Sequence, residues 1–70
     1  MQKLSKAAIG RSYTSQWMFG VPEVMDFLRE HHVEEGDNIQ IIRKLKDALI
    51  VGVKGSRFAM GNEIADRIQV

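Results

Sequence analysis

The sequence predicts a small, mostly β domain: a closed barrel of about five short strands, with one α-helix inserted after the first strand. Runs rich in β-branched and aromatic residues recur along the chain and are separated by short turns of Gly, Asn and Asp. Only one segment, near residues 21–32, has the apolar period of a helix. At 70 residues the chain forms a single domain, residues 1–70. Closure is favoured because so small a sheet could not cover its own edges.

The composition supports a globular domain. Apolar residues make up 44 % of the chain and charged residues 27 %. There is no cysteine, which excludes disulfides and thiolate metal clusters. No apolar run approaches the ~20 residues that a membrane span requires, and the first ten residues lack the apolar core of a signal peptide. We therefore expect a cytoplasmic protein.

The N-terminal half should form a strand and then the helix. Residues 11–17 mix β-branched and aromatic residues with hydroxyls, which is typical of a strand. Pro22 suits the first turn of a helix, because backbone N–H groups in that turn have no partner within the helix and the one that proline lacks is not missed. The helix should end near His32. We expect Phe27 and Leu28 to plug an open side of the barrel. The residues at i, i+3, i+4 and i+7 of one helix face are Val24, Phe27, Leu28 and His31.

The C-terminal half should supply the remaining strands. Residues 38–45 and 48–54 are predicted to form a hairpin, and Gly52 within the second strand suggests a bulge or sharp bend. Leu49, Val51 and Val53 share one face of that strand.

The closing stretch is predicted to turn at residues 55–56, form a strand over 57–60, and end in another strand after one helical turn. Asn62 should cap that turn. The core residues expected here are Phe58, Met60, Ile68 and Val70.

Charge is unevenly distributed although the net charge is only +1. Residues 23–37 hold six acids and one base, whereas the rest of the chain holds three acids and nine bases. This split fits either a solvated surface with internal charge balance or a surface that orients a charged partner. A basic set on the predicted hairpin could bind nucleic acid, but it lacks exposed aromatic residues for base stacking, so we expect no nucleic-acid partner.

No pattern of a catalytic or cofactor-binding site occurs. The chain has no nucleophile elbow, phosphate-binding loop or dinucleotide fingerprint. Asp26 and Glu30 form a like-charged i, i+4 pair, which we interpret as two solvated acids. His31 and His32 are weak metal candidates, because neighbouring helical side chains point about 100° apart. We therefore predict a non-enzymatic protein with no cofactor and no firm metal site.

Three large residues in a row, Trp17, Met18 and Phe19, fit either core packing, which could account for two of them, or a partner-binding surface. Consecutive strand residues cannot all face the core, so at least one should be exposed. Exposed aromatic and methionine side chains are favoured at protein contacts. The predicted partner-binding set is Trp17, Met18, Phe19, Met25, Arg29, Lys54 and Arg57.

An ordered set of positions resembles the FeoA family of bacterial ferrous iron uptake. Leu4 and Gly10 match positions near the start of the family's sequence pattern. The segment "FLREHHVEEGDNIQII" is similar to its helix, turn and strand, and "VGVKGSRFAMGNEIADRIQV" is similar to its ending, with Ala65, Ile68 and Val70 at fitting positions. The family usually has glycine at the position of His32 and proline at that of Glu35. Glycine would accept a left-handed helix end, so with His32 we expect either a different cap or some strain at the exit of the helix.

The resemblance implies an SH3-like barrel with a helical insertion. It also implies an accessory role with FeoB, a membrane iron transporter that carries a cytoplasmic GTPase domain. Because the same barrel forms the C-terminal domain of iron-dependent repressors, a stand-alone metal-binding or metal-sensing module is the alternative.

Overall fold

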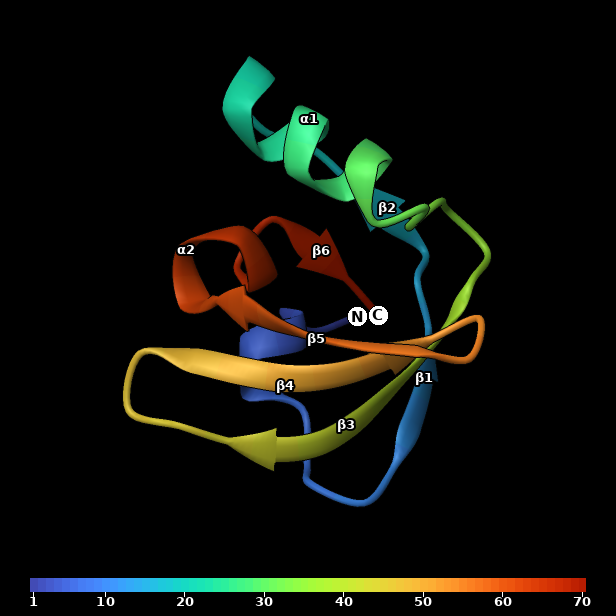
Figure 1. The fold of residues 1–70 in the computed structure, drawn as a ribbon, viewed down its shortest axis with the longest axis vertical. Helices are drawn as coiled ribbons and strands as arrows, with labels where there is room; N and C mark the ends of the chain where they lie inside the picture. Colours follow the sequence, from blue (N-terminus) through green and yellow to red (C-terminus); the bar gives the residue numbers. More distant parts are fainter.

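The computed structural model describes residues 1–70 and confirms a mostly β fold with six strands rather than about five. One antiparallel sheet has the order β1-β3-β4-β5, and a second pairs β2 with β6 (Figure 1). The termini lie side by side, because Gln2 and Val70 exchange two backbone hydrogen bonds of 3.0 and 2.9 Å. The elements are η1 (Leu4–Lys6), β1 (Ser12–Thr14), β2 (Trp17–Met18), α1 (Pro22–Glu30), β3 (Asn38–Lys44), β4 (Ala48–Val53), β5 (Ser56–Gly61), α2 (Asn62–Ala65) and β6 (Ile68–Gln69).

The prediction of one strand over residues 11–17 is wrong, because the chain changes sheets within it. The backbone of Ser15 bonds to Asp37 and Gly36, at 2.9 and 2.8 Å, beside the first sheet. The next residue, Gln16, donates to the carbonyl of Gln69 at 2.7 Å in the second. The hydroxyl of Ser15 is buried and donates to the carbonyl of Glu34 at 2.9 Å, which satisfies it.

The hairpins are confirmed, but two of their details differ from expectation. The irregularity lies in β3, between Ile41 and Arg43, whereas Gly52 pairs regularly with strands on both sides. The β4–β5 turn comprises Lys54 and Gly55, one residue earlier than predicted. Both have positive φ, 52° and 81°, as two-residue hairpin turns with matching twist require.

The last helical turn also begins differently from expectation. Asn62 is the first residue of α2 rather than its cap, and Gly61 holds the capping position. The Asn62 amide instead donates to the carbonyl of Lys46, at 3.4 Å, which ties α2 to the β3–β4 loop.

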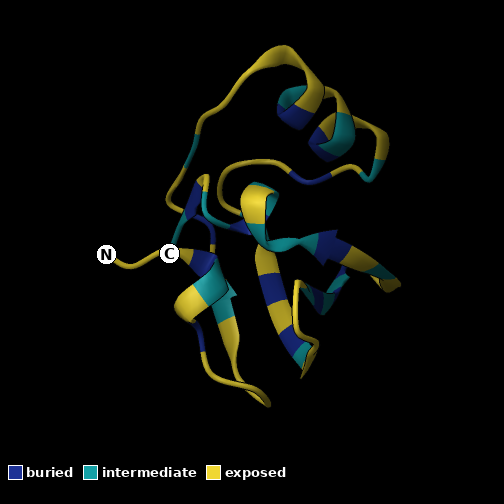
Figure 2. Cartoon of the chain, turned by 90° about the vertical axis from the view of Figure 1, so that its left-hand side faces the viewer, coloured by how far each residue is buried: buried dark blue, intermediate teal, exposed yellow.

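One hydrophobic core fills the space between the two sheets and α1. Alternation along the strands is plain in Figure 2, where buried and exposed residues follow one another. Of the predicted closing residues, Met60 and Ile68 are fully buried, while Phe58 and Val70 are half-buried and pack against the core. The buried apolar residues are Leu4, Ala7, Val24, Leu28, Val33, Ile39, Ile41, Leu49, Val51, Val53, Met60, Ala65 and Ile68.

Candidate functional site: a groove beside the helix

The helix α1 ends at Glu30, two residues earlier than predicted, and its exit shapes the candidate site. His32 lies at φ 57°, the left-handed region that favours glycine. Its N–H bonds to the carbonyl of Arg29 and that of Val33 bonds to Leu28, at 3.1 and 2.8 Å. These two bonds form a Schellman motif, in which Val33 folds back as a buried residue beneath the helix. Of the two expected outcomes, a different cap or strain, the structure has the second: the cap is of the glycine type, and His32 adopts its left-handed conformation.

A groove of about 380 Å³ opens between α1, β2 and the segment that follows the helix. We call it the apolar groove, because methionine, leucine and valine side chains form its floor. The helix presents Met25, Leu28 and Arg29 at i, i+3 and i+4, so one helical face forms a wall, and His32 extends the lining from just beyond the helix end. The lining residues are Met18, Met25, Leu28, Arg29, His32, Val33, Glu34 and Glu35.

The three consecutive large residues divide between core and solvent as expected. Met18 is half-buried and packs against the core from within the groove, whereas Trp17 is 55 % exposed and Phe19 40 % exposed. The two exposed rings contact each other, with centroids 5.5 Å apart. The guanidinium carbon of Arg67 lies 5.8 Å from the centre of the Phe19 ring, a cation–π contact that holds this ring beside β6.

Two polar contacts fix the edges of the apolar groove. The carboxylate of Glu35 accepts a hydrogen bond from the backbone N–H of Met18, at 3.2 Å, and so joins β2 to the segment after the helix. On the helix, Arg29 pairs with the exposed Asp26 at 2.8 Å. β2 pairs only with β6, so the Met18 N–H has no strand partner on the other side. Glu35 accepts its hydrogen bond instead.

The two histidines have different surroundings. His31 stacks between Phe27 and Phe58, with centroid distances of 4.3 Å to each, and its Nδ1 lies 2.9 Å from the carbonyl of Phe27. His32 instead lines the apolar groove. The structure does not bring either of them together with other ligands: no group of three or more His, Asp or Glu side chains is placed to hold a metal ion.

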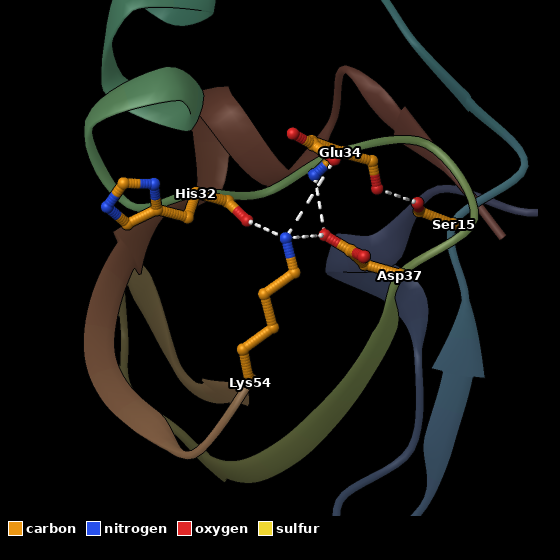
Figure 3. Close-up of polar contacts among 5 residues, drawn as sticks. All are labelled: Ser15, His32, Glu34, Asp37 and Lys54. Carbon is orange, nitrogen blue, oxygen red and sulfur yellow. Dashed lines mark hydrogen bonds and ion pairs between the residues drawn. The ribbon is translucent and has the colours of Figure 1, made fainter.

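Lys54 joins the acidic segment to the sheet. Its ammonium donates to the carbonyl of His32 at 2.9 Å and lies 3.3 Å from Asp37 and 3.9 Å from Glu34 (Figure 3). Figure 3 shows the lysine rising from the β4–β5 turn while the imidazole of His32 points away from it. Part of the charge asymmetry is therefore balanced within the molecule.

The structure divides the predicted binding residues between two places. Met18, Met25 and Arg29 line the apolar groove, whereas Trp17 and Phe19 flank Met18 in the chain, contact each other and are not part of the lining. The other two, Lys54 and Arg57, lie on a polar hollow of the sheet. Sequence reasoning missed the rest of the groove lining, although the i, i+3, i+4 spacing of Met25, Leu28 and Arg29 on the helix was a signal for Leu28. The lining residues not predicted as partner-binding are Leu28, His32, Val33, Glu34 and Glu35.

Comparison with known proteins identifies the class of domain first. The fold matches a zinc complex of FeoA from Stenotrophomonas maltophilia, described as a prokaryotic SH3 domain protein, with a TM-score of 0.77, 24 % identity, and coverage of 100 % of this chain and 89 % of that one. It also matches a manganese-dependent transcriptional repressor, with a TM-score of 0.86, 13 % identity, and coverage of 96 % of this chain and 39 % of that one. The chain is thus a small SH3-like domain.

The family follows from the sequence. The model of the FeoA domain matches residues 3–70, so this chain belongs to the FeoA family, which is associated with ferrous iron transport. A crystal structure of an iron uptake regulatory protein (FeoA) has a TM-score of 0.84 and 25 % identity, and the match covers 94 % of this chain and 89 % of that one. No curated protein matches. No helix here has the length and apolar character needed to span a membrane.

Proposed function

We propose that this chain is a cytoplasmic, non-enzymatic accessory protein of bacterial ferrous iron uptake. It acts by binding the cytoplasmic GTPase part of a FeoB-type transporter through the apolar groove and the aromatic pair beside it. The observation that carries the proposal is the exposed contact between Trp17 and Phe19, the two residues that flank Met18, which itself lines the groove. Rigid aromatic side chains with adaptable methionines are the composition expected at a protein contact.

The chemistry of the groove favours a particular kind of partner surface. Its floor of Met18, Met25, Leu28 and Val33 accepts an apolar side chain, and Glu34 and Glu35 stand at its edge. An apolar residue flanked by a Lys or Arg would bury its side chain between the methionines and place its charge near these acids. Electrostatic complementarity of this kind speeds encounter and fixes orientation.

The test is an NMR titration of the labelled chain with the GTPase domain of the cognate FeoB-type transporter at low salt. We expect chemical-shift changes at the Trp17 indole N–H, the Met18 amide and the Met25 methyl group. The amide signal of Ala48, on the β3–β4 hairpin, should not change. A titration that leaves all three groove signals unmoved contradicts the proposal.

The second candidate function is a metal-responsive module, supported by the likeness of the fold to a manganese-dependent repressor. That likeness, at 13 % identity, concerns the fold alone. His31 is half-buried against two phenylalanine rings, and its Nδ1 lies 2.9 Å from the backbone carbonyl of Phe27, which favours the accessory role. Titration with Zn²⁺ or Fe²⁺ separates the two: a saturable change in the ring signals of His31 or His32 would support the metal module.

A further inference from the structure

A second hollow, of about 390 Å³, lies on the outward side of the four-stranded sheet. We call it the polar hollow, since none of its lining residues is hydrophobic. The strand register explains how it forms. Ser12 pairs with Gln40, Gln40 with Gly52, and Gly52 with Arg57, so four outward positions form one row across all four strands. The lining residues are Ser12, Asn38, Gln40, Gly52, Lys54, Gly55, Ser56 and Arg57.

Gly52 leaves the floor of the polar hollow open. Its neighbours Val51 and Val53 are buried, so a side chain at position 52 would point outward into the hollow. A Cβ there would lie 3.3 Å from the Cδ1 of Ile42, the flexible end of a side chain that can give by a few tenths of an ångström. Gly52 does not have a positive φ. Backbone conformation and severe crowding therefore do not demand glycine. Glycine in a strand interior marks a bulge, a bend or the close approach of a ligand, and here it also lies beside the irregularity in β3.

The polar hollow carries positive charge and unused hydrogen-bonding groups. It contains two cations and no acid. The ammonium of Lys54 is held by His32 and Asp37, but the guanidinium of Arg57 forms no ion pair and no hydrogen bond within the chain. The hydroxyl of Ser12 and the amide of Gln40 are likewise free of side-chain partners, and both are exposed.

This combination is suited to an oxyanion. A guanidinium donates two parallel hydrogen bonds to a carboxylate or phosphate, and such charge-assisted pairs are roughly twice as strong as neutral ones. Hydroxyl and amide groups along the same row can supply further donors. The volume lies at the lower end of the range for small-molecule sites, about 300–1,000 Å³.

We propose that the polar hollow binds the carboxylate or phosphate group of a small anionic solute, with Arg57 as the anchoring cation and Gly52 providing the open floor. This site is separate from the apolar groove and does not depend on the proposed partner. A carboxylate and a phosphate group share the relevant chemistry, because each is a compact anion with at least two oxygen acceptors.

The test is a titration of the ¹⁵N-labelled chain with sodium phosphate and, separately, with sodium succinate, each against sodium chloride at equal ionic strength. We expect saturable shifts of the Gly52, Gly55, Ser56 and Arg57 amides with at least one of the two anions and none with chloride. Saturable shifts with only one of the two anions support the proposal and show whether the site prefers phosphate or carboxylate groups. The absence of saturable shifts with both overturns it.

Variants separate a defined site from diffuse attraction to positive charge. Arg57→Gln should weaken anion binding at least tenfold, and Gly52→Ala, which fills the floor, at least threefold with the amide spectrum otherwise retained. Arg43→Gln is the matched control, because it removes one positive charge from the same sheet outside the polar hollow. Equal weakening by Arg43→Gln and Arg57→Gln contradicts the proposal.

Discussion

The apolar groove and the polar hollow have nearly the same volume, about 380 and 390 Å³, but opposite chemistry. Half of the residues that line the groove are hydrophobic, whereas none of those in the hollow is. The groove arises where a helix and a short strand leave the barrel and cannot bury all their large side chains. The hollow arises on the outward face of the four-stranded sheet, where glycine stands in a row of polar side chains. The lining, not the size, therefore decides which ligand class each can take.

Lys54 connects the two regions. It lines the polar hollow, yet its ammonium contacts the carbonyl of His32 and the carboxylate of Glu34, two residues that line the apolar groove. Substitutions can therefore affect one region, the other, or this connection, and the expected effects differ in size.

The largest effect is expected at the floor of the apolar groove. Leu28 is 1 % exposed and belongs to both the groove and the core. Leu28→Ala should lower the free energy of unfolding by about 2–4 kcal/mol, since it removes buried methyl groups and leaves a cavity. Leu45→Ala, at a residue 45 % exposed, is the matched control and should cost less than about 1 kcal/mol. Urea denaturation measures both, and equal losses would show that the groove floor is not part of the core.

A smaller effect is expected where the two regions join. Lys54→Met keeps most of the aliphatic side chain but removes the ammonium that bonds to His32 and Asp37. Because the side chain is 48 % exposed, we expect a loss of only about 1 kcal/mol in the free energy of unfolding. Lys46→Met, with no ion pair to lose, should be neutral. If the two variants unfold at the same urea concentration, the contact does not stabilise the fold.

The smallest change is expected at the helix exit, and it is a gain. His32→Gly should raise the free energy of unfolding by about 0.5–1 kcal/mol, because glycine adopts positive φ without the steric cost of a Cβ. His32→Ala removes the ring but keeps the backbone penalty, so it should give no gain. Thermal unfolding of the pair distinguishes the backbone from the imidazole, and a gain with alanine would contradict the assignment of strain to the backbone.

The sequence predicted those parts of the fold that local patterns determine. Alternation placed β4 correctly and grouped Leu49, Val51 and Val53 on one face, which the structure shows to be the buried one. The division of residues 11–17 into two strands could not be predicted, because it depends on where Ser15 and Gln16 find backbone partners far along the chain. Local propensity carries no information about such pairings.

The candidate site was predictable to a similar extent. Three large residues in a row cannot all be buried, so the sequence predicts at least one exposed side chain there, and the exposed ones are Trp17 and Phe19. The opposite wall of the apolar groove follows from the helical spacing of Met25, Leu28 and Arg29, but only once Met18 of β2 is known to face it. The contact of Lys54 with the carbonyl of His32 forms because the β4–β5 turn lies beside the segment after α1. No sequence pattern predicts this contact.

The affinity of the chain for the cognate GTPase domain, measured by calorimetry on three proteins, tests the central claim most directly. Trp17→Ala should raise the dissociation constant at least tenfold relative to the unsubstituted chain, because it removes an exposed aromatic anchor beside the apolar groove. Arg57→Gln, in the polar hollow, should leave it within about twofold. An unchanged dissociation constant for Trp17→Ala, or a larger loss for Arg57→Gln, would contradict the assignment of partner binding to the apolar groove.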